Sequence, residues 1–276
     1  MLNLTAAIDS GIPMLVFSPH LDDAVLSCGG LILYARKRTQ VTVVTLFTEG
    51  APPPYTLSAR RYLKLVGACR AEELFRERRA EDREVLEAMG VTCIHGKLTD
   101  ALFRRKPSGG HTSRWERLLP ELGYVYPVYR IQITAGRMSP NDGPTLVAAR
   151  DIVEKFAFPG PSLLLAPLGV GGHIDHVLTR TAAERSGART IYYSDFPYNV
   201  RRLPHSQRHR PDVTFIQDNN LAEARWSGLL DAKAELIRAY RTQESMIFPD
   251  GHIPAVPERF FIPRDGVVSC DVPSSN

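Results

Sequence analysis

The sequence predicts an α/β fold with a mostly parallel sheet flanked by helices and the active site at the carboxyl edge of the strands. Short apolar runs alternate with segments of helical periodicity along most of the chain. Two of these runs each lead through a short turn into a His/Asp cluster and then a helix. Because parallel strands end at the same edge of a sheet, both clusters would meet there, although about 150 residues separate them.

The first cluster contains His20, Asp22 and Asp23, which follow the apolar run at residues 14–17. Two carboxylates and an imidazole within four residues suit a divalent cation, because both groups are good zinc ligands. In the alternative interpretation one aspartate only caps the helix that begins near Ala24. Capping explains one carboxylate and leaves His20 and the second carboxylate without a role.

The segments after this cluster continue the alternation of strand and helix. Residues 41–47 are rich in β-branched side chains and predict a second buried strand. Residues 58–89 predict a helix that is broken near Gly67, and Gly90 is expected to end it before a third strand at 91–95. The apolar face of this helix is predicted to contain Ala80, Val85, Leu86 and Met89.

Residues 96–141 carry few periodic signals. We expect one domain over residues 1–276 with an irregular insertion at about 96–141. Long insertions of this kind often contact substrate or form a lid, but a solvated loop with some helix is an equally good interpretation.

Regular patterns resume after the insertion. Helices are predicted from Pro144 to Phe156, at 177–186 and from Arg225 to Tyr240. The apolar set of the first of these helices is Leu146, Val147, Ile152 and Val153. Strands are predicted at 162–166, 190–193 and 258–262. The second cluster, His173, Asp175 and His176, follows the strand at 162–166.

Composition excludes several classes of protein. The chain has 276 residues, of which 43% are hydrophobic and 23% charged, and its net charge of +4 does not favour nucleic-acid binding. No apolar run approaches the ~20 residues that span a bilayer, and we expect no signal peptide. Four widely spaced cysteines without a C-x-x-C pair favour a reducing compartment, so we expect a cytoplasmic protein.

The two clusters together supply the groups needed to hydrolyse an amide. A catalytic zinc site takes about three protein ligands and keeps one position open. A further carboxylate can take a proton from water, a further histidine can donate to the oxyanion, and a third carboxylate can orient that histidine. The six residues available for these roles are His20, Asp22, Asp23, His173, Asp175 and His176.

These motifs resemble those of the PIG-L/LmbE-like zinc-dependent deacetylases. The resemblance rests on Pro-His-Leu-Asp-Asp at 19–23 and Gly-Gly-His-Ile-Asp-His at 171–176. Arg-Arg-Ala-Glu at 78–81, and Lys233 followed by Tyr-Arg-Thr-Gln at 240–243, extend it across most of the chain. It implies a Rossmann-like fold and the removal of acyl groups from N-acylated amino sugars and related glycoconjugates.

The resemblance also implies residue roles. His20, Asp23 and His176 would bind Zn2+, or another divalent cation. Asp22 would be the general base, His173 the oxyanion-stabilising general acid, and Asp175 the partner that orients His173. The commoner family motif has Pro and Glu where this chain has Leu21 and Ala24. The motif residues of this chain resemble more closely those of a branch of the family that acts on antibiotic-type glycosides.

The expected function is therefore a metal-dependent hydrolase that removes an N-acetyl or N-acyl group from an amino sugar or an amino-sugar-bearing natural product. The expected partner is this small molecule, without nucleic acid or membrane, and the oligomeric state is left open, a homo-oligomer included. The alternative is a non-catalytic member that binds a glycan or a nucleotide, with glycine-rich residues 169–172 around a phosphate. The complete G-x-G-x-x-G spacing is absent from that loop.

Substrate selectivity would come from the segments around the metal. The candidates are residues 52–55, the 96–141 insertion and a basic loop at 201–210. That basic loop is either solvated or the rim of a pocket that recognises a carboxylate or phosphate.

Overall fold

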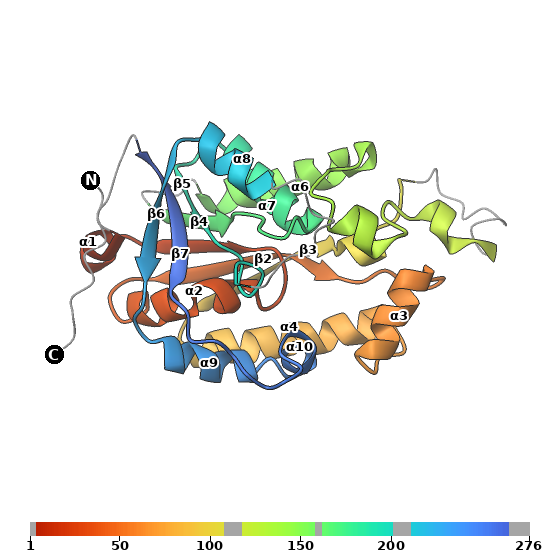
Figure 1. Ribbon diagram of the computed structural model, residues 1–276, viewed down its shortest axis with the longest axis horizontal. Coiled ribbons are helices and arrows are strands. Elements are labelled where there is room, and N and C mark those ends of the chain that lie inside the picture. The colour runs from red at the N-terminus through yellow and green to blue at the C-terminus, as the bar shows by residue number, and fades with distance from the viewer. Residues whose placement is uncertain (1–3, 108–117, 158–161, 201–210, 265–276) are drawn as a thin grey trace.

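A seven-stranded sheet forms the centre of the computed structural model, which describes residues 4–107, 118–157, 162–200 and 211–264 (Figure 1). The strand order is β3-β2-β1-β4-β5-β7-β6. The strands are β1 Met14–Ser18, β2 Val41–Glu49, β3 Thr92–Thr99, β4 Leu163–Pro167, β5 Thr190–Tyr193, β6 Leu221–Trp226 and β7 Glu258–Pro263. Strands β1 to β5 pair in parallel, and β7 runs antiparallel to both β5 and β6. The predicted α/β class with a mostly parallel sheet is confirmed.

Helices cover both faces of this sheet. The helices are α1 Leu4–Asp9, α2 Asp23–Ala35, α3 Leu57–Leu65, α4 Ala71–Ala88, α6 Gly143–Ala157, α7 Ile174–Arg185, α8 Pro211–Asp218, α9 Leu230–Arg238 and α10 Arg241–Ile247. Helices α2, α4, α9 and α10 lie on one side of the sheet, and α6, α7 and α8 lie on the other (Figure 1). Among the described residues, no helix is both long and apolar enough to cross a membrane.

Strand β1 is buried on both faces, which explains its continuous apolar run. Leu15 and Phe17 belong to one hydrophobic cluster, and Met14 and Val16 belong to another on the opposite face. This alternation follows from the two-residue period of a strand. A central strand covered by helices on both sides therefore needs apolar residues at every position.

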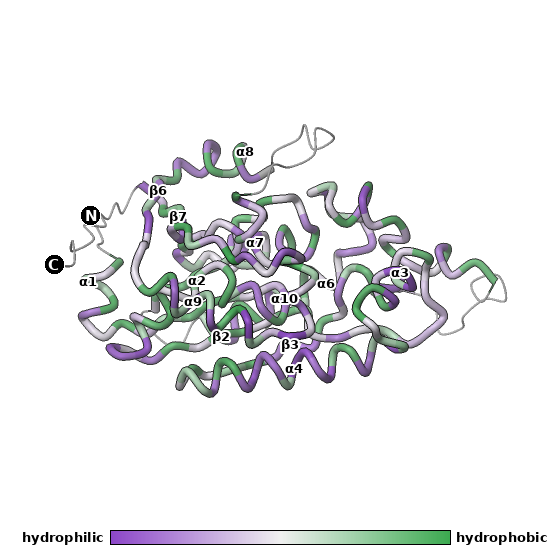
Figure 2. The backbone as a smooth tube through the Cα atoms, turned by 60° about the horizontal axis from the view of Figure 1, so that its bottom comes forward, coloured by the Kyte–Doolittle hydropathy of each residue, from purple (hydrophilic) through white to green (hydrophobic). Residues whose placement is uncertain are grey.

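The break in the predicted helix at 58–89 is confirmed, since α3 ends at Leu65 and α4 begins at Ala71. Gly67 and Gly90, at φ of +71° and +69°, adopt the left-handed conformation that glycine accommodates after a helix. Figure 2 shows α4 as an alternation of hydrophilic and hydrophobic residues, as expected for a helix with one face on the core.

The predicted apolar face of α4 is wrong at one residue, because Ala80 is exposed. The buried face instead continues through the charged side chains of Arg78, Glu81 and Asp82. Each of these has a polar partner inside the protein, which offsets the cost of burying it. Val147 of α6 was likewise expected to be apolar and inward, but it is 51% exposed.

The predicted helix from Arg225 to Tyr240 is wrong in its first part. Arg225 and Trp226 end β6, which pairs with β7 from Leu221 opposite Pro263 to Trp226 opposite Glu258. Helix α9 begins only at Leu230. The pairing partner of β6 comes about 40 residues later in the chain, so the local pattern did not reveal it.

The described part of the insertion packs against the core and is not a solvated loop. Strand β3 extends four residues past its predicted end, to Thr99. The single turns that follow are η1 Ala101–Phe103, η2 Pro120–Gly123, η3 Tyr129–Ile133 and η4 Pro140–Asp142. Phe103, Tyr126 and Ile133 are buried in the same hydrophobic cluster as Phe17. The basic loop at 201–210 lies outside the described residues.

Candidate functional site

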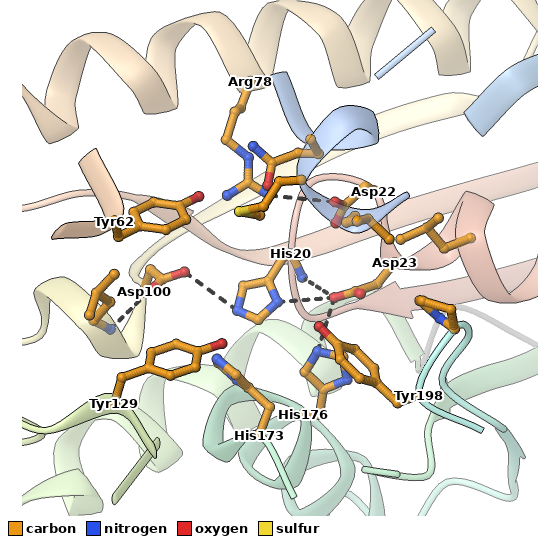
Figure 3. Close-up of a pocket in the computed structure, with 16 residues that line it drawn as sticks. His20, Asp22, Asp23, Tyr62, Arg78, Asp100, Tyr129, His173, His176 and Tyr198 are labelled. Atoms are coloured by element: carbon orange, nitrogen blue, oxygen red, sulfur yellow. Dashed lines mark hydrogen bonds and ion pairs between the residues drawn. The ribbon is translucent and has the colours of Figure 1, made fainter. Parts of the chain in front are cut away.

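The six predicted site residues converge at the carboxyl edge of the parallel strands. Figure 3 shows five of them lining one pocket, and the sixth, Asp175, lies 3.2 Å from His20. They come from the turn after β1, the N-terminus of α2, and the start of α7, which begins at Ile174 rather than at the predicted 177. The turn after β1 is closed by Ser18, whose hydroxyl donates to the His20 carbonyl at 2.7 Å and accepts from the Ala24 N–H at 3.0 Å. The clusters predicted to meet are therefore in contact.

The carboxylate of Asp23 lies between two histidines. Its Oδ2 is 3.1 Å from His20 Nδ1 and 3.2 Å from His176 Nε2, and it also accepts the His20 N–H at 2.9 Å (Figure 3). Burial by itself would raise the pKa of Asp23, but His176 and His20 outweigh burial and hold this pKa well below its usual range. Both histidines predicted as metal ligands therefore contact the predicted carboxylate ligand.

The carboxylate of Asp22 faces a different partner, Arg78 of α4, at 3.7 Å. Burial and then the negative charge of Asp23 raise the pKa of Asp22 to about 6. A carboxylate with such a pKa is well matched to accept a proton near neutral pH.

Asp175 was expected to orient His173. Its carboxylate instead contacts three other groups. It lies 3.2 Å from His20 Nε2, accepts the Ala101 N–H at 2.8 Å and forms an ion pair with Arg104. Burial would raise its pKa, but Arg104 outweighs burial and lowers it. Asp175 is completely buried, so it acts on the site through His20.

His173 is oriented by the backbone of Asp175. Its Nδ1 accepts the Asp175 N–H at 3.3 Å, which makes His173 the N-cap of α7. Burial and then the neighbouring His20 lower the pKa of His173 well below its usual value. A neutral His173 that accepts at Nδ1 carries its proton on Nε2.

The chemistry of the donor set fits a divalent cation. Nitrogen atoms of His20, His173 and His176 lie within 4.8 Å of one another, so this group contains two of the predicted ligands and His173 in place of Asp23. Burial by itself lowers the pKa of His20, but hydrogen bonds with Asp175 and Asp23 outweigh burial and raise it to about 9. Burial also lowers the pKa of His176, but Asp23 and Asp195 outweigh burial and raise this pKa. The carboxylates thus favour positive charge at this point. Without a metal, this charge is carried by protons on the histidine rings, which a bound cation would displace.

Two further carboxylates were missed from the sequence. Asp100 Oδ2 is 3.5 Å from His20 Nε2, and Asp195 Oδ1 is 2.6 Å from His176 Nδ1. Asp100 directly follows β3, and Asp195 comes two residues after β5. The rule that identified the two clusters, a polar residue just after a parallel strand, could have found both. Asp100 was missed because the predicted third strand ended too early.

Asp195 also argues against the phosphate-binding alternative. Its Oδ2 accepts the backbone N–H groups of Gly169 and Val170 at 2.8 and 2.7 Å. The donors that would cradle a phosphate in this glycine-rich loop are therefore already bound to a carboxylate of the same chain.

A pocket opens above these residues. It encloses about 640 Å³ of empty space, a volume that includes open solvent at its mouth. Besides the site residues, its walls include Tyr62, Tyr129, Tyr198 and Gln243. Their rings and amide offer the mixture of flat apolar surface and hydrogen-bonding groups that a sugar requires.

Comparison with known proteins identifies relatives over most of the chain. Residues 15–186 match the model of the PIG-L family, described as GlcNAc-PI de-N-acetylase. The 2'-N-acetylparomamine deacetylase of Streptomyces fradiae is 28% identical over 192 residues, which are 68% of this chain. The match spans only 58% of the length of that relative.

Solved structures of similar fold are also described as deacetylases. A deacetylase from the biosynthesis pathway of teicoplanin has a TM-score of 0.63 and 25% identity, covering 90% of this chain and 96% of its own. The zinc-inhibited form of teicoplanin deacetylase Orf2 has a TM-score of 0.62 and 24% identity, covering 90% and 97%. The second likeness supports the fold alone. Since the family model matches more than half of the residues, the chain belongs to the PIG-L family.

Proposed function

We propose that this protein is a zinc-dependent N-deacetylase that removes an N-acetyl or N-acyl group from an amino sugar or an amino-sugar-bearing natural product. The observation that carries the proposal is the Asp23 carboxylate between His20 and His176, beside the second carboxylate of Asp22 in the same pocket. The relatives support the substrate class, since one is named 2'-N-acetylparomamine deacetylase and another is a deacetylase of the biosynthesis pathway of teicoplanin. We also propose that residues 1–276 form one domain, since the sheet takes strands from Met14 to Pro263.

His20, Asp23 and His176 would hold the cation. When bound, zinc lowers the pKa of water toward neutrality and polarises the amide carbonyl. Asp195 fixes the ring of His176 through Nδ1, which leaves Nε2 directed at Asp23. Such a partner on the far nitrogen is the usual way in which proteins orient a ligating histidine.

Asp22 would act as the general base. Its carboxylate lines the pocket without belonging to the ligand set, so it is free to accept a proton from the attacking water. Burial and the charge of Asp23 raise the pKa of Asp22 to about 6, and Arg78 opposes them by stabilising the ionised form. The same carboxylate would return the proton to the leaving amine, a role that the resemblance had given to His173, whose lowered pKa leaves its ring neutral.

His173 would stabilise the developing oxyanion. Its neutral ring carries a proton on Nε2, and it lines the pocket beside His20, with ring centroids 4.8 Å apart. A hydrogen bond that strengthens as charge develops lowers the barrier rather than the substrate dissociation constant. Asp175 would contribute by positioning, since its N–H holds His173 and its carboxylate holds His20.

The test is to measure amine release by metal-free and metal-loaded protein. A panel of N-acyl glucosamine-type glycosides, varied separately in acyl length and aglycone, should release free amine and acid only when metal is present. A parallel series with zinc, cobalt and manganese identifies the activating ion, and a zinc titration detects inhibition by excess zinc. Full activity after thorough chelation would overturn the metal assignment. Faster turnover of peptides or esters than of every glycoside would overturn the amino-sugar assignment.

A further inference from the structure

A second cluster of metal-ligand side chains lies outside the pocket. It consists of Asp82 on α4 and of Cys93 and His95 on β3. Because successive side chains of a strand alternate between faces, Cys93 and His95 project to the same side of the sheet. Asp82 approaches them from the helix that packs there, and all three side chains are buried or half-buried.

The three donor atoms form a compact triangle. His95 Nε2 is 2.9 Å from Asp82 Oδ2 and 3.3 Å from Cys93 Sγ, and the sulfur is 3.7 Å from the same Asp82 oxygen. In a nucleophilic relay the acid and the thiol would contact opposite nitrogens of the imidazole. Here both contact the same nitrogen, so the atoms surround a shared centre instead of forming a chain.

The size of this triangle matches tetrahedral zinc. Zinc bonds of about 2.3 Å to sulfur and about 2.0–2.2 Å to nitrogen and oxygen separate the donors by roughly 3.4–3.6 Å at tetrahedral angles. The observed separations of 2.9, 3.3 and 3.7 Å differ from these values by a few tenths of an ångström. Side-chain rotations alone can correct such differences.

The surroundings of the cluster favour a ligand role. The hydroxyl of Tyr240 donates to Asp82 Oδ1 at 2.9 Å, which leaves Oδ2 directed into the triangle. Groups that orient a ligand in this way are typical of metal sites.

We propose that Asp82, Cys93 and His95 form a second zinc site that joins α4 to β3, the outermost strand at its end of the sheet. Thiolate, imidazole and carboxylate together select zinc among the abundant divalent cations. Water would complete the coordination. This site stabilises the structure and is separate from the proposed chemistry in the pocket.

Cobalt substitution tests the proposal directly. Cobalt bound to a thiolate gives a near-ultraviolet charge-transfer band, whereas the pocket ligands are only nitrogen and oxygen. The protein loaded with cobalt should show this band, and Cys93→Ser should lose it. Cys69→Ser is the matched control, because Cys69 is an exposed free thiol, and it should keep the band. Zinc content should fall from two per chain to one in Cys93→Ser, and also to one in Asp23→Asn.

Thiol protection gives a second measurement that needs no variant. Zinc should slow the alkylation of Cys93 by iodoacetamide at least several-fold, and the modified peptide can be quantified by mass spectrometry. The proposal is overturned by a zinc content of one per chain that Asp23→Asn abolishes. It is equally overturned if zinc leaves the alkylation rate of Cys93 unchanged. Neither result depends on catalytic activity, so failure here is distinct from failure of the deacetylase assignment.

Discussion

The pocket site (His20, Asp23 and His176) and the helix–strand site (Asp82, Cys93 and His95) contain similar donors in different settings. The pocket residues come from turns and helix starts just beyond strand ends, and they face open space. The other residues come from the interior of α4 and β3. The pocket admits a substrate beside its proposed metal, whereas none of the three helix–strand residues lines that pocket. The place of the ligands in the fold therefore suggests chemistry for one site and stability for the other.

Helix α4 connects the two sites. Arg78 contacts Asp22 in the pocket, and Asp82, one turn later on the same face, belongs to the helix–strand site. Asp22 is a pocket carboxylate outside the proposed ligand set, and the helix–strand site has no such additional acid among its three donors. Of the two proposed sites, the pocket is the one that combines ligands with a proposed general base, and this difference can be tested first.

The largest effect is expected from Asp23→Asn. An amide is a weak zinc ligand and cannot balance the charge of the two histidines, so the pocket metal and all measurable turnover should be lost. Metal analysis and amine release on the same sample check this result. Asp9→Asn, a change at an exposed residue, is the control and should keep both metal and turnover. Turnover near that of the unaltered protein in Asp23→Asn would contradict the ligand assignment.

Asp22→Asn should keep the metal and lose turnover by about 10² to 10⁴, the usual contribution of a general base. The reason is that asparagine cannot accept the proton of water. Single-turnover kinetics with parallel metal analysis separates this outcome from ligand loss. If Asp22→Asn releases the metal while Asp23→Asn retains it, the two aspartates have exchanged roles.

Asp195→Asn should weaken metal binding at the pocket by about 10- to 100-fold, because this carboxylate holds His176 from the far side of the ring. Competition with a chelator measures the affinity, and saturating metal should restore most of the turnover. Loss of turnover that saturating metal does not restore would mean that Asp195 supports the fold of the 169–170 loop rather than metal binding.

The smallest effect is expected from Cys93→Ser, and it concerns stability. Zinc at about 100 times its dissociation constant adds about 2.7 kcal/mol to the stability of the folded protein. This corresponds to roughly 5 °C in Tm for a chain of this size. Calorimetry of Asp23→Asn, which isolates the helix–strand site, should show this gain, and Asp23→Asn combined with Cys93→Ser should lose it. If zinc raises the Tm of both proteins equally, the helix–strand site does not have the proposed structural role.

Sequence patterns alone predicted the elements that carry the pocket. The runs at 14–17 and 163–166 are apolar throughout because their strands are buried on both faces, a requirement that leaves a clear local signal. The placement of His/Asp clusters directly after them was sufficient to predict that His20 and His176 meet. This inference needs only the direction of parallel strands, which the alternation of strand and helix already implies.

Tertiary structure decided the partners of the charged residues. Nothing local in the sequence links Asp175 to Arg104 and His20, Asp195 to His176, or Asp82 to Tyr240, since each pair joins different segments of the chain. The strand identity of Leu221–Trp226 was hidden for the same reason, because its hydrogen bonds go to β7. A buried charge or an antiparallel strand at one end of the sheet depends on groups brought together by folding. A run of apolar residues, in contrast, indicates from the sequence alone that the segment is buried.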